Sequence, residues 1–317
     1  MTKATQFAER QYETVFHGEL AARLGGPFVP TQPLEMYLGI DAATDARDAH
    51  RIWRILNANI PQRTTLTPLL WPRLPRRYCP MISGRVVSLF FQFKVPKYND
   101  ATKAKYAATF GASYFEVAIT KHQQKSLMEL QRRVKPRALV RYASPAFWTR
   151  ADFDRHAVKQ QVLSMSAHIV PSQVGTHKKW MYAKPSGKAV LNPDPEEVES
   201  VGWEAITGLM GEKARKESFR AHVAGLAASI REASADSSDQ REPDWLIGLR
   251  EYARESQARF EFSPEDGRYL VDLRTVSDAA EQADTTWLVM LSPDSMTWDL
   301  FRIWERDAEM LWRRHWF

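Results

Sequence analysis

The pair Gln92 and Lys94 is the feature of this chain whose residue types and spacing point most directly to chemistry. Both residues lie near the end of the apolar run SLFFQFK at positions 88–94, which is typical of a β-strand. Because side chains alternate along a strand, Gln92 and Lys94 share one face, and Phe91 and Phe93 lie on the other. An amide oxygen can bind a hard cation and an ammonium group can stabilise negative charge. The pair therefore indicates a polar functional site, since such groups are costly to bury without a purpose.

Asp41 ends a second strand-like run, LEMYLGID at positions 34–41. Alternation in this run places its leucine, methionine and isoleucine side chains on one face and Asp41 on the polar face. Each of these residues also has a simpler explanation. Asp41 could cap the helix that is predicted to follow it, and Lys94 could extend from an edge strand into solvent.

An Asp at the end of one strand and a Gln-x-Lys pair on the next resembles the PD-(D/E)xK, or restriction-endonuclease-like, superfamily. The match is to the variant with Gln at the middle position, as in Mrr-like enzymes. The resemblance implies a Mg²⁺ (or Mn²⁺) site with Asp41 as the first ligand and the amide oxygen of Gln92 as a weaker one. Lys94 would orient the attacking water or stabilise the charged phosphate in the transition state.

A glutamate on the first helix often completes sites of this superfamily. Glu13 is the candidate third catalytic carboxylate and metal ligand, because it lies one turn before Phe16 on the side of the helix predicted to face the core. Glu9 and Glu19 are the competing residues on the same helix.

Two departures from the superfamily pattern leave a second interpretation open. The separation between Asp41 and Gln92 is longer than is typical and requires an insertion over about residues 44–83. Gln92 also replaces the usual acidic residue, which removes one metal-binding charge. The alternative is a catalytically degenerate nuclease fold that acts as a nucleic-acid-binding or scaffold subunit.

The elements that must position these residues can be predicted from hydrophobic periodicity. The order is helix, strand, strand, helix, strand, at residues 7–24, 34–41, 85–95, 122–134 and 138–143. This is the core order that the resemblance implies, so we expect an α/β protein with a restriction-endonuclease-like core, a mixed sheet flanked by helices. A segment at residues 114–119 is predicted as a short strand or as the start of the next helix.

The second half of the chain has weaker patterns. We predict helices at 151–165, 196–233, 245–257 and 298–316, a turn at 192–195, a linker at 234–240, a hairpin at 259–275 and a strand at 286–291. These patterns divide the chain into a nuclease domain at 1–192 and a mainly helical, Trp-rich part of unknown role at 193–317. The final predicted helix is a candidate element for homo-oligomer formation.

The charge of the chain suits a polyanionic partner. The net charge is +6 and the sequence pI is about 9.3. Candidate nucleic-acid contacts are Arg76 and Arg77 in a proline-rich segment, Lys97 after the Gln-x-Lys strand, and His122 at the start of the following helix. A structural role at a helix start is the alternative for His122. DNA is the expected substrate, and RNA is a second candidate.

Composition and motifs exclude several other classes. No apolar run approaches the ~20 residues that span a bilayer, so no membrane partner is expected. Cys79 is the single cysteine, which leaves no internal disulfide and no cysteine-based zinc site and favours a cytoplasmic location. The sequence contains neither a phosphate-binding P-loop nor a Gly-x-Ser-x-Gly motif. By analogy alone, the resemblance implies an effector nuclease of a prokaryotic anti-phage defence system, held in check until a partner activates it.

Overall fold

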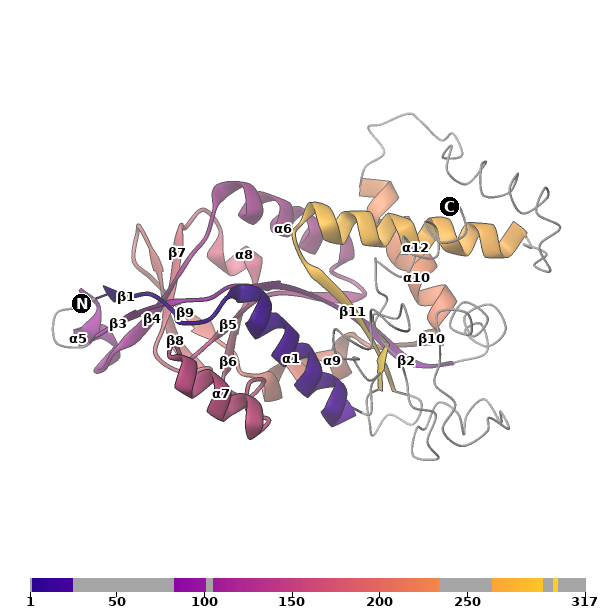
Figure 1. Ribbon diagram of the computed structural model, residues 1–317. Coiled ribbons are helices and arrows are strands. Elements are labelled where there is room, and N and C mark those ends of the chain that lie inside the picture. The colour runs from indigo at the N-terminus through magenta and orange to yellow at the C-terminus, as the bar shows by residue number, and fades with distance from the viewer. Residues whose placement is uncertain (1, 25–82, 101–104, 234–263, 293–298, 302–317) are drawn as a thin grey trace, which may run out of the picture.

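The computed structural model describes residues 2–24, 83–100, 105–233, 264–292 and 299–301 (Figure 1). Asp41, Arg76 and Arg77 lie outside the described residues, and so do the predicted strand at 34–41 and the predicted helix at 245–257. The outcomes below concern the described part of the chain.

Two β-sheets form the framework of the described residues. The first sheet is antiparallel and contains, in spatial order, β1 (Thr2–Lys3), β3 (Lys97–Asn99), β4 (Tyr114–Ala118), β7 (Lys179–Tyr182), β8 (Gly187–Asn192) and β9 (Glu196–Ser200). The second sheet contains β12 (Asp299–Phe301), β11 (Thr286–Ser292), β2 (Ser83–Phe93), β5 (Ala138–Pro145) and β6 (Ser166–Ile169), with β10 (Arg215–Ser218) paired to the start of β2. In this second sheet β2 and β5 are parallel and every other pairing is antiparallel, so the sheet is mixed.

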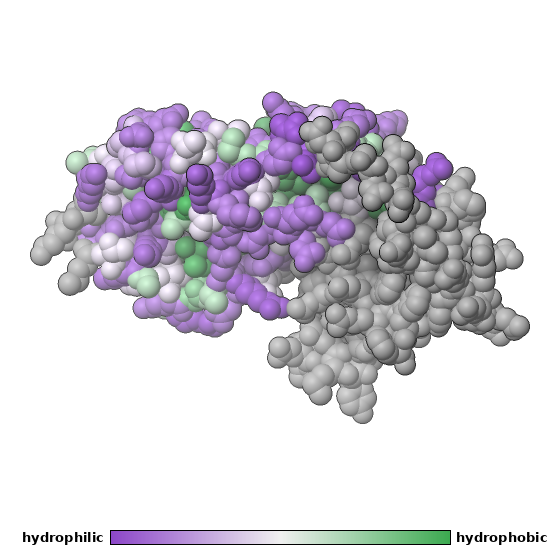
Figure 2. All heavy atoms as spheres, turned by 90° about the horizontal axis from the view of Figure 1, so that it is seen from above, coloured by the Kyte–Doolittle hydropathy of each residue, from purple (hydrophilic) through white to green (hydrophobic). Residues whose placement is uncertain are grey.

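Helices cover both faces of the mixed sheet, as Figure 1 shows. On one side lie α1 (Glu9–Leu24), α7 (Arg150–Val158) and α9 (Trp203–Lys213). On the other side lie α6 (Lys121–Val134), α8 (Pro171–Val174), α10 (Phe219–Ala233) and α12 (Pro264–Gln282), and a short helix, α5 (Ala107–Phe110), lies beside the first sheet. Figure 2 views the molecule from the α6 and α12 side, where hydrophilic residues dominate the described surface.

Alternation along β2 explains the two hydrophobic cores. Phe90 faces the α6, α10 and α12 side, where it packs with Leu127 and Leu226. Phe91 faces the α1, α7 and α9 side, where it packs with Phe16. Each face of the sheet is thus closed by helices whose apolar residues recur with helical spacing.

Several predicted elements are confirmed. The structure has helices α1 and α6 and strands β2, β5 and β11 at the predicted places, within a few residues at their ends. The segment at 114–119 is a strand, β4. The described part of the chain is therefore a mixed α/β fold with helices on both sides of its mixed sheet. None of the described helices is long and apolar enough to cross a membrane.

Other predicted elements are wrong, for physical reasons that can be named. Within the predicted hairpin at 259–275, the described residues 264–275 form the start of α12, because Pro264 occupies the first helical turn, where its missing N–H costs nothing. The predicted helix at 196–233 contains two strands, β9 and β10, before and between α9 and α10. The glutamates of β9 tolerate a strand because the edge position leaves them mostly exposed.

Two helices are also shorter than predicted or differ in type. The helix predicted at 151–165 ends at Val158, and within the helix predicted at 298–316 the described residues, Asp299–Phe301, form strand β12.

The turn after Asn192 joins β8 to β9 as a hairpin. Strands from beyond residue 192, β10 and β11, pair with β2, so the mixed sheet draws on both predicted domains.

Candidate active site

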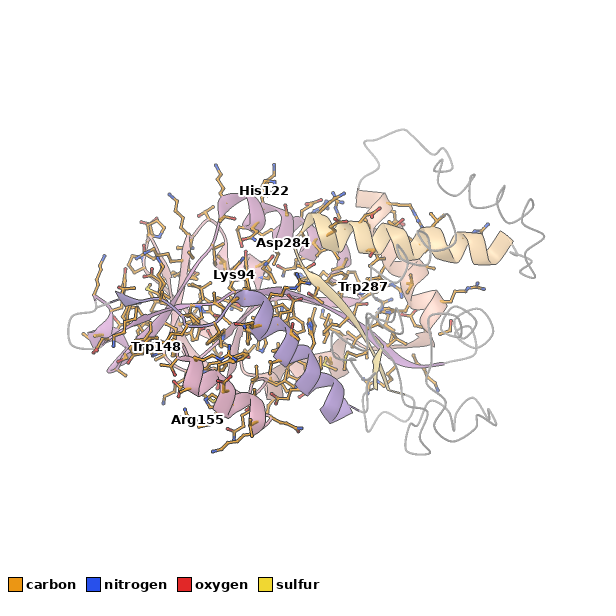
Figure 3. The ribbon with its side chains drawn as sticks, viewed as in Figure 1. Lys94, His122, Trp148, Arg155, Asp284 and Trp287 are labelled. Atoms are coloured by element: carbon orange, nitrogen blue, oxygen red, sulfur yellow. The ribbon has the colours of Figure 1, made fainter. Side chains whose placement is uncertain are left out.

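Gln92 and Lys94 lie at the carboxyl end of β2, between the starts of α1 and α6. Gln92 is only 2% exposed and its Cα pairs with that of Tyr142 on β5. Lys94 follows the last residue of the strand, and its Nζ lies 3.7 Å from Oε2 of Glu9 in the first turn of α1. Figure 3 shows Lys94 and Asp284 in the same region of the molecule.

Asp284 is the residue of this site that the sequence analysis missed. It lies between α12 and β11, and the antiparallel register that pairs Thr286 with Phe91 brings it to the end of β2. Its Oδ2 accepts a hydrogen bond of 2.6 Å from Nε2 of Gln123 on α6 and one of 3.3 Å from Nε2 of Gln92. The structure therefore places a carboxylate from the connection between α12 and β11 beside Gln92 of the predicted Gln-x-Lys pair.

The backbone of Asp284 marks it as unusual. The Thr285 amide donates to the Ala280 carbonyl at 3.0 Å and the Asp284 amide donates to the Glu281 carbonyl at 2.8 Å, which is the hydrogen-bond pattern of a Schellman motif at the end of α12. Asp284 occupies the left-handed position of that motif, with φ of 52°, where glycine is usual. A side chain in this conformation costs roughly 1 kcal/mol. Aspartate is among the residues that tolerate this conformation best, and here it brings the carboxylate to the end of β2.

The amide of Gln92 has an unsatisfied oxygen. Its Oε1 is buried and has no hydrogen-bond partner, whereas its Nε2 lies 3.3 Å from both Asp284 Oδ2 and the Phe93 carbonyl oxygen. An unpaired buried acceptor costs about 1–3 kcal/mol. A half-turn of the amide would exchange its oxygen and nitrogen and bring three oxygens together, the donor type that hard cations prefer.

The three glutamates of α1 have different partners. Glu13, the predicted third ligand, accepts a hydrogen bond from the Thr286 hydroxyl, on β11. Glu19 accepts from the Leu163 amide at 3.1 Å. Glu9 is the glutamate that faces Lys94. Burial raises the pKa of Glu9, the Lys94 ammonium opposes this, and the negative charges of Asp284 and Glu13 reinforce it. Glu9 is thus electrostatically part of the site.

The donor set suits Mg²⁺ only in company with other ligands. Among the described residues, no three His, Cys, Asp or Glu side chains converge closely enough to hold a metal ion. Mg²⁺ is often held by one or two carboxylates, with water and substrate phosphate completing its shell. Asp284 would fit that mode of binding together with the Gln92 oxygen once a half-turn of the amide brings that oxygen toward Asp284.

The predicted nucleic-acid contacts that the structure describes lie near this end of the sheet. Lys97 is exposed on β3, three residues beyond Lys94. His122 is exposed in the first turn of α6, adjacent in sequence to Gln123 (Figure 3). The first turn of α6 contains no acidic residue of its own, and Gln123 in that turn donates to the Asp284 carboxylate. The carboxylate therefore lies at the positive end of the helix dipole, which favours negative charge.

A weak sequence signal for Asp284 exists. It stands just before the buried run TWLVML at 286–291, much as Asp41 adjoins its own apolar run. The sequence alone does not distinguish the two aspartates. The structure shows that β11, which begins two residues after Asp284, pairs with β2, whereas Asp41 lies outside the described residues. No protein-family model, no curated protein and no solved structure matches this chain.

Proposed function

We propose that this chain is a Mg²⁺-dependent phosphodiesterase that cleaves DNA, with Asp284, Gln92 and Lys94 as its reactive group. The observation that carries the proposal is the position of Asp284, held in a left-handed conformation against Gln92 at the end of β2. A carboxylate at the start of one strand beside a Gln-x-Lys pair at the end of its antiparallel neighbour supports a restriction-endonuclease-like core.

Each residue has a chemical task in this proposal. The oxygens of Asp284 and Gln92 would hold Mg²⁺, which when bound neutralises phosphate charge and lowers the pKa of water. Lys94 places its ammonium group beside the scissile phosphate, where it orients the attacking water and stabilises the developing charge. Gln123 donates to Asp284 and so fixes the direction of its carboxylate. Glu9 holds Lys94 at the end of β2 before substrate binds.

DNA is the proposed substrate because the chain is basic and exposes Lys97, three residues after Lys94, and His122, next in sequence to Gln123. Arg76 and Arg77 remain predicted contacts outside the described residues. A role as a defence effector with an activating partner stays an analogy.

The decisive experiment is cleavage of plasmid and single-stranded DNA by the full chain, with Mg²⁺ or Mn²⁺ and with EDTA. We expect metal-dependent cleavage that Asp284→Asn and Lys94→Ala both abolish. Matched controls are Asp154→Asn and Lys159→Ala, exposed residues at α7, a helix that contributes no residue to the candidate site; both should cleave like the parent. Loss of activity in the control variants, or full activity in Asp284→Asn, would contradict the proposed site.

Asp41→Asn tested in parallel decides which aspartate serves the reaction. If Asp41→Asn is inactive and Asp284→Asn is active, the carboxylate is the one first predicted from the sequence. If both are inactive, the site uses two aspartates.

The alternative function is DNA binding without cleavage, by a degenerate nuclease fold. The observation that favours it is Gln92 in place of an acidic residue, together with the lack of a three-ligand group among the described residues. It predicts DNA binding that persists in EDTA, weakens steeply with salt and survives Lys94→Ala. Fluorescence anisotropy with labelled duplex DNA measures all three properties.

A further inference from the structure

A chain of buried hydrogen bonds links β11 to β2 a few residues from the candidate site. The Trp287 Nε1–H donates to Ser88 Oγ at 3.0 Å, and Ser88 Oγ lies 3.0 Å from His222 Nε2. His222 Nδ1 lies 2.9 Å from Glu217 Oε1, and Arg137 donates to the same carboxylate at 2.7 Å. Ser88 and His222 are fully buried, so this is an internal network.

The chemistry of the partners fixes the direction of every bond. An indole N–H can only donate, so Ser88 Oγ accepts from Trp287. The Glu217 carboxylate can only accept, so His222 donates to it from Nδ1, and Glu217 also accepts from Arg137. Burial lowers the pKa of His222 and so favours the neutral ring, whose Nε2 then accepts the proton of the Ser88 hydroxyl. Although serine, histidine and glutamate stand in the order of a nucleophilic site, the Ser88 hydroxyl is buried and engaged on both sides. The network is therefore suited to holding elements in place and not to attacking a substrate.

What the network holds is the pairing of β11 with β2. In the observed register Thr286 pairs with Phe91 and Trp287 pairs with Phe90. A slip of one residue would exchange the two faces of β11, which the two cores forbid. A slip of two residues leaves each side chain of β11 on its present face and preserves the backbone hydrogen bonds between the strands. It would move Asp284 by roughly 6.8 Å along β2, beyond hydrogen-bond reach of Gln92. Side-chain contacts must therefore select between these registers.

Trp287 supplies two such contacts. Its ring stacks on Phe90, with centroids 6.1 Å apart and an interplanar angle of 4°, and its N–H reaches Ser88 on the same face of β2. A slip of two residues would place Trp287 opposite Ser88 or Gln92 and no longer opposite Phe90, so the two contacts could not be kept together.

We propose that Trp287, Ser88 and His222 are positioning residues that lock β11 in the register that sets the Asp284 carboxylate beside Gln92. The register lock is inferred from the contacts of Trp287, Ser88 and His222. Its effect on catalysis rests on the proposed function. Glu217 on β10 bonds to His222, and Arg137, the residue before β5, bonds to Glu217. In this way α10 and β10 support the site from a distance.

The experiment reads the register directly. Cysteines replace Arg85 and Ser292, whose Cα atoms pair in the observed register, in the full chain with Cys79→Ser. Oxidation should give the disulfide in high yield in the parent and in low yield after Trp287→Phe combined with Ser88→Ala. Trp287→Phe alone keeps an aromatic ring opposite Phe90 and removes the indole N–H, so it reports on the hydrogen bond to Ser88 if the double variant fails to fold. Trp203→Phe, at another buried tryptophan outside the network, is the matched control and should cross-link like the parent.

A second readout links the register to the site. The Mn²⁺ concentration for half-maximal cleavage should rise about tenfold in Trp287→Phe, the usual cost of disturbing the groups that orient a metal ligand, while Trp203→Phe leaves it unchanged. Unchanged cross-linking in both Trp287→Phe and Ser88→Ala would overturn the inference. Reduced cross-linking in a chain that never cleaves DNA would uphold the register lock and refute the proposed function, so the two failures are distinguishable.

Discussion

The carboxylate of Asp284 lies 2.6 Å from the side-chain amide of Gln123, although 161 residues separate them in the chain. This contact joins the end of α12 to the start of α6 and places an exposed negative charge beside the buried amide of Gln92. The site is thus assembled from α1, β2, α6 and β11, which lie far apart in the sequence.

Asp284→Gly and Asp284→Ala should differ in stability but not in activity. Both remove the carboxylate and should abolish metal-dependent cleavage. Glycine adopts a φ of 52° without strain, whereas alanine does not, so the glycine variant should be more stable than the alanine variant by about 1 kcal/mol. Urea denaturation measures the difference.

The same pair of substitutions at Asp154 is the control. Asp154 is exposed inside helix α7, where glycine should be less stable than alanine by about 1 kcal/mol. Opposite signs at the two positions would confirm that residue 284 has a left-handed backbone conformation. The same sign at both would show that its backbone is ordinary.

Local pattern was enough to predict most elements that carry the site, and long-range pairing was not. The alternation in β2 and the apolar stripe of α6 are written in consecutive residues, so both were found. The strand that pairs with β2 is β11, which lies about 200 residues later in the chain. No local sequence pattern shows that these two strands are neighbours. The turn-like residues after Pro264 were misassigned for a related reason, because Pro, Asp and Gly favour both tight turns and helix starts.

Gln92→Glu should make the stability of the protein depend on Mg²⁺. A second carboxylate 3.3 Å from Asp284 would be buried beside a like charge, so the metal-free variant should lose about 1–3 kcal/mol. Mg²⁺ bound between the two carboxylates should restore about 2.7 kcal/mol at a hundredfold excess over its dissociation constant. Thermal unfolding with and without Mg²⁺ tests this. A loss that Mg²⁺ leaves uncorrected would refute a metal position between residues 92 and 284.

His168 should make the fold sensitive to acid. Both of its ring nitrogens are buried without a hydrogen-bond partner, and burial, reinforced by the positive charge of Arg141, lowers the pKa of His168 to about 3. The folded state therefore binds this proton more weakly than the unfolded state. The contribution of His168 to the free energy of unfolding is therefore fully present above pH ~6.5. It falls by about 1.4 kcal/mol per pH unit as the pH drops from there toward the pKa of His168 in the folded state.

His168→Phe should remove that part of the pH dependence, since phenylalanine fits the ring contacts with Phe16 and Phe91. The difference in unfolding free energy between variant and parent, measured from pH 7 to pH 5, isolates this histidine from all other titrating groups. A constant difference across that range would contradict the prediction.

Gly225→Ala should damage the network that supports β11 from a distance. A Cβ at Gly225 would lie 2.3 Å from Cζ of Arg137, so the guanidinium must move away from Glu217. Displacing it leaves the carboxylate that holds His222 partly unpaired, and we expect a loss of about 1–3 kcal/mol. Gly208→Ala is the control, because nothing lies within 4 Å of its Cβ position in helix α9, and there alanine should stabilise by about 1 kcal/mol. If Gly225→Ala also stabilises, as helix propensity alone predicts, Arg137 can leave its position freely, and the support of His222 by Glu217 does not depend on it.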